Sequence, residues 1–217
     1  DVFDPKVGSI EAYPSVLVKQ TAEIKPVSMS GPGKNVYLFD FGQNFSGVAR
    51  IRVSGKRGQK ITVRYGEMLH PDGRLMTENL RFARVTDTYI MRGDEVEIWQ
   101  PKFTYHGFQY VELRGLTEKP ELDAVTGIVL NSVCEPTGSF ECSNEMINKL
   151  YSNILWTQRA NFFEVPTDCP QRDERCGWSG DAQIYARSAA YNADVQAFIG
   201  KWLVDLEDAQ RPDGEFT

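Results

Sequence analysis

Residues 36–65 decide the fold of the first half of the chain, and they read VYLFDFGQNFSGVARIRVSGKRGQKITVRY. Ile51 and Val53 alternate with arginines, and the last six residues of the stretch alternate in the same way. A period of two is typical of a strand with one face in the core and the other in water. Two glycine-containing segments, GQNFSG and SGKRG, interrupt this alternation and predict turns. We therefore expect strands over residues 36–41, 48–53 and 60–65.

The same signals continue as far as residue 133. Short apolar runs bounded by glycine, proline and aspartate predict four further strands, over residues 86–91, 97–99, 110–113 and 124–130. Many short strands joined by turns are typical of an antiparallel β-sandwich, which we assign to residues 1–133. We interpret the two histidines, His70 and His106, as polar groups of a loop or of the sheet surface.

After residue 138 the hydrophobic period changes from two to between three and four, which predicts helices. We expect the first helix to have Ser143 as its N-cap and to end near Phe163. Asp181 is the expected cap of a second helix that ends at about Asn192. A third helix is expected from Asp194, with an apolar face made by Phe198, Trp202, Leu203 and Leu206. The boundary between the strand-rich and helical parts is expected within residues 134–142.

Three amphipathic helices are too few to close a layer of their own, so we expect the chain to be a fragment of a longer protein. The first five residues, DVFDP, lack methionine, a basic region and an apolar segment, and so are typical of a cut made inside a longer sequence. Helices of an unfinished layer would expose their apolar sides. We therefore expect homodimer formation through the exposed helical faces.

Composition excludes several classes of partner. The net charge is −6, without the basic face that nucleic acid requires, and no apolar run approaches the roughly 20 residues of a membrane span. We expect no metal and no cofactor, because no close cysteine pair accompanies the two histidines. A Cys134–Cys142 disulfide and reduced thiols both remain open. The compartment also stays open between the cytoplasm, the periplasm and the outside of the cell.

Residues 168–182, DCPQRDERCGWSGDA, contain the densest chemistry of the chain. Proline and glycine make the stretch a loop that ends at the start of a helix. Its charged and aromatic side chains are Asp168, Arg172, Asp173, Glu174, Arg175, Trp178 and Asp181. Paired carboxyl groups beside an aromatic ring are what glycosidic-bond cleavage needs. Crowding would keep one acid protonated, the two arginines would hold the others ionised, and Trp178 would offer a flat face to a sugar.

A structural interpretation of the same residues stands beside this one. Asp168 precedes Pro170 and could be an ordinary turn residue. The run from Arg172 to Arg175 could be a solvated cluster of ion pairs, as most charge runs are. Trp178 could pack under the loop. Spacing alone leaves these two interpretations open.

The longer stretch 165–182, VPTDCPQRDERCGWSGDA, closely resembles the catalytic motif of bacterial α-L-rhamnosidases, glycoside hydrolase family 78. Residues 39–47 (FDFGQNFSG) and 65–69 (YGEML) resemble the β-sandwich that precedes the catalytic barrel in that family. The resemblance implies an inverting hydrolase that releases L-rhamnose from a glycoside or polysaccharide. It also implies that residues 134–217 are the N-terminal part of an (α/α)6 toroid of six helical hairpins, here truncated.

By the same resemblance, Glu174 would be the general acid. The sugar subsite would be lined by Asp168, Arg172, Asp173, Trp178 and Asp181. Two positions depart from the usual family pattern, since Cys176 stands where leucine is usual and Ser179 where threonine is usual. The general base of the family is a glutamate far downstream, beyond the end of this chain. We therefore expect the isolated chain to hydrolyse almost nothing.

Two other functions remain to be weighed. The chain could be a non-catalytic carbohydrate-binding β-sandwich module with a helical stub, and its sugar contacts would then fall on sheet aromatics such as Tyr105, Phe108 and Tyr110. It could also be a different inverting glycosidase built on the same toroid, such as an unsaturated uronidase or a trehalase-like enzyme. The signature within residues 168–175 (DCPQRDER) is what favours a rhamnosidase over the latter.

Overall fold

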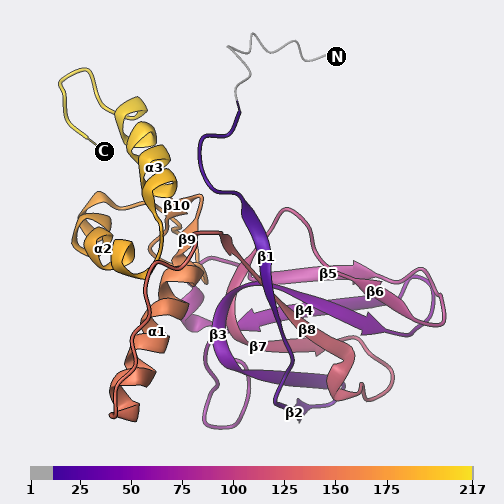
Figure 1. The fold of residues 1–217 in the computed structure, drawn as a ribbon. Helices are drawn as coiled ribbons and strands as arrows, with labels where there is room; N and C mark the ends of the chain where they lie inside the picture. Colours follow the sequence, from indigo (N-terminus) through magenta and orange to yellow (C-terminus); the bar gives the residue numbers. More distant parts are fainter. Residues whose placement is uncertain (1–11, 217) are drawn as a thin grey trace, which may run out of the picture.

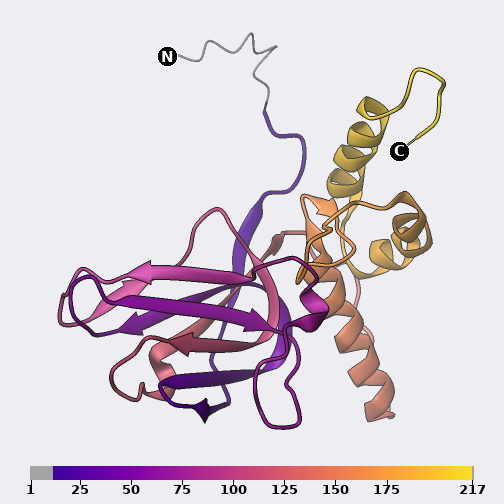
Figure 2. The same ribbon diagram turned by 180° about the vertical axis from the view of Figure 1, so that it is seen from behind.

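The structure is a computed structural model that describes residues 12–216. The expectation about the first five residues lies outside the described residues. Figures 1 and 2 show a strand-rich half and, beside it, a helical half that contains the C-terminus. The strands are β1 (Val18–Ile24), β2 (Ser28–Gly33), β3 (Val36–Val53), β4 (Lys60–Gly66), β5 (Thr86–Ile90), β6 (Glu97–Trp99), β7 (His106–Arg114), β8 (Val125–Ser132), β9 (Phe162–Phe163) and β10 (Val165–Pro166). The helices are α1 (Glu145–Asn161), α2 (Ser179–Asn192) and α3 (Gln196–Asp208), with the short 3-10 helices η1 (Glu78–Leu80) and η2 (Leu122–Ala124).

The first eight strands form one antiparallel sheet in the order β1-β8-β3-β7-β4-β5, and both β2 and β6 pair with β3. The sheet curls around β3, so that its inner face encloses a single hydrophobic core (Figure 1). Aromatic rings fill the centre: the Phe45 and Phe108 rings lie 4.5 Å apart, and the Phe41 ring meets the Phe45 ring edge-on at 5.7 Å. The expected antiparallel sandwich followed by helices is confirmed.

The turn predicted over residues 42–47 is wrong. β3 runs through this segment without a break and is 18 residues long. Its pairing with β7 shifts register between Asp40 and Phe45, and Gly42 there adopts a φ of 67°. A bulge with glycine in the left-handed region bends a strand without ending it. The glycine-rich signal was therefore that of a bend, which lets β3 pair first with β2 and then with β8.

The helix termini also differ from expectation. Asn144, not Ser143, caps α1, because its Oδ1 accepts hydrogen bonds from the backbone N–H groups of Met146 (3.0 Å) and Ile147 (3.3 Å). α1 ends at Asn161, since the next residues pair as the β9–β10 hairpin. Asp181 is not a cap either: α2 already begins at Ser179, which places Asp181 in its first turn.

The assignment of His106 to the sheet surface is wrong. His106 is buried, its Nε2 lies 3.0 Å from Asp87 Oδ2, and its ring stacks on the Tyr65 ring at 4.1 Å. The Tyr65 hydroxyl donates to the same Asp87 oxygen at 2.7 Å. His70 does lie at the surface, beside Glu78. All four cysteine thiols are free, so the Cys134–Cys142 disulfide is not formed.

The helices leave much apolar surface uncovered within the described residues. Of the face predicted for α3, Phe198 and Trp202 are buried, whereas Leu203 is exposed. Other exposed apolar side chains on the helices are Met146, Ile147, Leu150 and Ile154 of α1, Ile184 of α2 and Val204 of α3. Among the residues described, the helices are too short or too polar to cross a bilayer.

Candidate active site

The charged stretch identified in the sequence forms a loop between β10 and α2, closed across its base by Asp168. The Asp168 Oδ1 atom accepts the backbone N–H of Cys176 at 2.9 Å, and the Asp168 N–H donates to the Cys176 carbonyl at 3.2 Å. Partial burial acts to raise the pKa of Asp168, but hydrogen bonds from the Cys169 thiol and the Cys176 N–H outweigh it, and the pKa falls below its ordinary value. Carboxylate crowding does not keep this acid protonated.

Glu174 lies at the centre of the loop and both of its carboxylate oxygens have partners. Its Oε2 atom accepts from Arg81 Nη1 at 2.8 Å and from Arg172 Nη2 at 3.0 Å. Its Oε1 atom accepts from the indole Nε1 of Trp178 at 3.2 Å. The side chain is 21% exposed, so it is fixed in orientation yet open to a ligand. Three predicted site residues, Arg172, Glu174 and Trp178, are thus brought together.

Trp178 does not pack under the loop. The residue is 46% exposed, and its indole N–H donates to Glu174. The structural interpretation of this residue is therefore wrong. An exposed indole face beside an oriented carboxyl group is an arrangement that can hold an apolar sugar face.

Asp173 and Asp181 point to other places. The Asp173 Oδ1 atom accepts the backbone N–H of Phe82 at 3.2 Å, which ties the loop to the strand-rich half. Asp181 is exposed on the first turn of α2, and no hydrogen bond joins its side chain to Glu174 in the described part of the chain. The structure therefore brings Asp173 near Glu174 through the backbone only, and leaves Asp181 apart.

Arg175 does not hold a carboxylate, contrary to expectation. Its Nη2 atom donates to the carbonyl oxygens of Tyr105 (2.8 Å) and Pro170 (2.9 Å). Its guanidinium lies 4.0 Å above the Tyr105 ring, close enough for a cation–π interaction. Arg175 therefore fastens the loop to the residue that precedes the start of β7.

The strand-rich half packs closely against this loop through Tyr105 and Gly107, a surface that we call the seat of the loop. Tyr105 stacks on Phe163 with ring centroids 3.7 Å apart, and beside it a Cβ atom built at Gly107 would come within 2.9 Å of the Gln171 nitrogen. Phe108 is fully buried in the core. Tyr105 and Phe108, two of the aromatics considered for a sugar-binding module, thus face the loop and the core, which argues against that alternative.

Two acidic or basic residues near the site escaped the sequence analysis. Arg81 follows η1, 93 residues before its partner Glu174, and no pattern in the sequence links them. Glu67 accepts from Asn44 Nδ2 at 2.8 Å, and burial raises its pKa although the charge of Arg172 opposes this. It belongs to the YGEML segment, which was a usable signal. Glu67 and Asp168 both line a cavity of about 290 Å³ between the sheet and α1.

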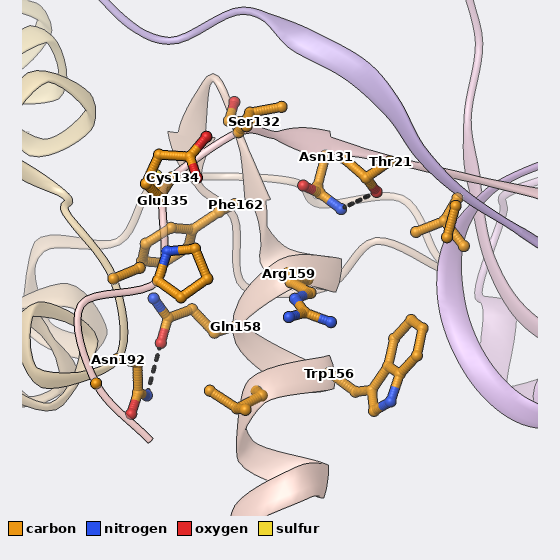
Figure 3. Close-up of a pocket in the computed structure, with 17 residues that line it drawn as sticks. Thr21, Asn131, Ser132, Cys134, Glu135, Trp156, Gln158, Arg159, Phe162 and Asn192 are labelled. Atoms are coloured by element: carbon orange, nitrogen blue, oxygen red, sulfur yellow. Dashed lines mark hydrogen bonds between the residues drawn. The ribbon is translucent and has the colours of Figure 1, made fainter.

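A separate cavity of about 260 Å³ lies where β1 and β8 meet α1, and Figure 3 shows its lining. Two pairs of its polar groups are hydrogen-bonded: Asn131 donates to the Thr21 hydroxyl at 3.0 Å, and Gln158 Oε1 accepts from Asn192 at 2.8 Å. None of the residues from 168 to 181 lines it. We therefore regard it as packing space between the two halves.

Asp168, Cys169 and Glu174 present three ligand atoms within 4.8 Å of one another, a spacing that could hold a metal ion. The Cys169 thiol, however, already donates to Asp168, and burial together with that carboxylate raises its pKa. Two guanidinium groups occupy Glu174. A cation there would be repelled by both arginines, so this donor set does not suit a metal.

Comparison with known proteins connects this geometry to one family. Residues 31–131 match the model of the bacterial alpha-L-rhamnosidase concanavalin-like domain, and residues 135–217 match that of the bacterial alpha-L-rhamnosidase 6 hairpin glycosidase domain. A protein of Streptomyces avermitilis named alpha-L-rhamnosidase is 47% identical over 200 residues, which are 92% of this chain and 19% of that protein.

Solved structures of alpha-L-rhamnosidases also resemble this chain in fold. The Streptomyces avermitilis alpha-L-rhamnosidase complexed with L-rhamnose superimposes with a TM-score of 0.94 at 46% identity, over 96% of this chain and 20% of the other. The alpha-L-rhamnosidase from Dictyoglumus thermophilum gives 0.91 at 43% identity, over 94% of this chain and 23% of the other. The chain spans about a fifth of the length of these relatives. It belongs to the bacterial α-L-rhamnosidase family, glycoside hydrolase family 78.

Proposed function

We propose that this chain is the segment of an α-L-rhamnosidase that supplies the general acid, Glu174. In this proposal residues 1–133 form the supporting sandwich domain, and residues 134–217 form the beginning of the six-hairpin catalytic domain. The observation that carries the proposal is the set of hydrogen bonds that holds Glu174. Its Oε2 atom accepts from two arginines, and its Oε1 atom accepts from the Trp178 indole N–H. These hydrogen bonds orient a proton donor without burying it.

The geometry supports separate tasks for the neighbouring residues. Trp178 offers an exposed apolar face that suits the methyl group of a deoxy sugar. Arg172 orients Glu174, and Asp168 closes the loop that carries both. We propose that Asp173 and Asp181 contact the sugar only through the remaining hydroxyl groups of its ring, because neither touches Glu174. The substrate class is a glycoside or polysaccharide with a terminal α-L-rhamnose.

We further propose an inverting reaction with a general base outside these 217 residues. Inversion requires a second carboxylate roughly 6.5–9.5 Å from the acid, with room for a water molecule between them. Asp168, Asp173 and Glu174 are occupied by the contacts described above, and Asp181 lies apart on the first turn of α2. About four fifths of each relative lies outside the region that this chain matches, which leaves ample length for a base.

The test uses the full-length polypeptide that contains this segment, with para-nitrophenyl α-L-rhamnoside as substrate. Glu174→Gln should lower kcat by about 10²- to 10⁴-fold, the usual contribution of a general acid. Glu164→Gln is the matched control, because Glu164 is an exposed glutamate earlier in the same connection. Proton NMR should show the β-anomer of rhamnose first. Unimpaired rhamnose release by Glu174→Gln would overturn the assignment, and a first-formed α-anomer would overturn inversion alone.

A further inference from the structure

We propose that Arg81, from the strand-rich half, is a positioning residue for Glu174, so that this half is part of the catalytic centre and not merely its support. The inference rests on the proposed role of Glu174 as the proton donor. Its basis is a direct ion pair: Arg81 Nη1 lies 2.8 Å from Glu174 Oε2.

The two oxygens of the Glu174 carboxyl group differ in their partners, because both arginines contact the same one. Arg81 and Arg172 both donate to Oε2, at 2.8 and 3.0 Å. Oε1 has a single, longer bond of 3.2 Å to the Trp178 N–H. Charge-assisted hydrogen bonds are stronger than neutral ones. Oε2 is therefore fixed by the two arginines, and Oε1, whose one hydrogen bond is the weaker, is the oxygen that meets the glycosidic oxygen.

The residues on either side of Arg81 fix its position. Leu80, the residue before it, is 2% exposed and packs into the core of the sandwich. Phe82, the residue after it, donates its backbone N–H to Asp173 Oδ1 at 3.2 Å. Two consecutive residues of the sandwich are thus bonded to two consecutive residues of the loop. This double contact fixes where the Arg81 guanidinium meets Glu174.

The pairing is stronger after proton transfer than before it. Glu174 gives its proton to the bridging oxygen while the bond from that oxygen to the anomeric carbon breaks, and the bond electrons leave with the aglycone. A water molecule supplies the new hydroxyl group and passes its own proton to the base. Glu174 ends as a carboxylate, which a guanidinium stabilises more than the neutral acid. An interaction that strengthens in the transition state accelerates the reaction.

The experiment compares Arg81→Met with Arg84→Met in the full-length polypeptide. Arg84 is an exposed arginine of the same turn and makes no ion pair within the described residues. Each variant is assayed on methyl α-L-rhamnoside, whose leaving group needs a proton, and on dinitrophenyl α-L-rhamnoside, whose leaving group does not. Arg81→Met should lose about 10- to 100-fold in kcat on the methyl glycoside, the value of one charged hydrogen bond, and less than about 3-fold on the dinitrophenyl glycoside.

Arg81→Lys keeps the charge and should recover part of the loss, and it serves as the informative variant if Arg81→Met fails to fold. Equal losses on the two substrates would mean that Arg81 only supports the fold, and they would overturn the inference. So would an Arg81→Met enzyme that matches Arg84→Met. Glu174→Gln is measured in parallel: if it retains full activity on the methyl glycoside, the proposed function fails, whereas its loss beside an intact Arg81→Met enzyme refutes the role of Arg81 alone.

Discussion

Replacing Gly107 with alanine would place a methyl group against the back of the loop that carries Glu174. The new Cβ atom would lie 2.9 Å from the Gln171 nitrogen and 3.0 Å from Pro170 Cγ. Comfortable contacts between such atoms are about 3.5–4.0 Å, so the loop must retreat by roughly half an ångström or more. Gln171 directly precedes Arg172, one of the two arginines that hold Glu174.

A shift of this size should be visible both in kinetics and in stability. Misplacement of catalytic groups by about 1 Å can cost about 10²-fold, so we expect Gly107→Ala to lower kcat/KM by about 10- to 100-fold, or about 1.4–2.7 kcal/mol of transition-state stabilisation. Overpacking of the seat should also cost about 1–3 kcal/mol in the free energy of unfolding.

The assay is rhamnose release from an aryl α-L-rhamnoside by the full-length polypeptide, together with thermal unfolding. Gly31→Ala is the matched control. A Cβ atom built at Gly31, in β2, would meet its nearest neighbour, the Val36 carbonyl oxygen, at an ordinary 3.7 Å. Gly31→Ala should keep nearly normal kcat/KM. A Gly107→Ala enzyme as active as this control would show that the loop does not depend on its seat, and would refute the reasoning.

The remaining predictions concern stability, activity and assembly of the chain itself. Hydrogen bonds from the Tyr89 hydroxyl and from the backbone N–H groups of Arg92, Gly93 and Asp94 lower the pKa of Glu97 from 4.5 to about 2. The stability that this carboxylate contributes is therefore present above pH 4.5 and is lost as the pH falls toward 2, so the Tm difference between wild type and Glu97→Gln should shrink over that window; a constant difference would be inconsistent with it. The isolated 217-residue chain should release almost no rhamnose, and turnover near the usual enzymatic range of about 1–10³ s⁻¹ would contradict a base outside it. Light scattering should find dimers or larger species formed through the exposed apolar side chains of α1, such as Met146 and Leu150, and a monomer in dilute solution would speak against this.

Sequence patterns predicted the strands and helices well where neighbouring residues alone determine the secondary structure. The alternation of Ile61, Val63 and Tyr65 predicted β4, and the helical period predicted α1. Errors arose where two local signals coincide. Gly42 serves a bend as readily as a turn, and Ser143 and Asn144 are both good caps, so that only the backbone geometry decides between them.

The site was predictable only within the loop. The resemblance of residues 165–182 to the family motif implied that Arg172, Glu174 and Trp178 share one site, and the structure joins them by hydrogen bonds. Arg81 and the seat at Gly107 depend on contacts between segments far apart in the chain, which no local pattern encodes. For the same reason Arg175 was misassigned, since its true partners are the carbonyl of Tyr105 and that of Pro170.

The most direct test of proton donation by Glu174 is the leaving-group dependence of Glu174→Gln in the full-length polypeptide. A series of aryl α-L-rhamnosides is used, from good to poor leaving groups. The wild-type kcat/KM should vary little along the series, whereas that of Glu174→Gln should fall steeply as the leaving group worsens, because nothing protonates the departing oxygen. Parallel dependences for the two enzymes would contradict the role assigned to Glu174.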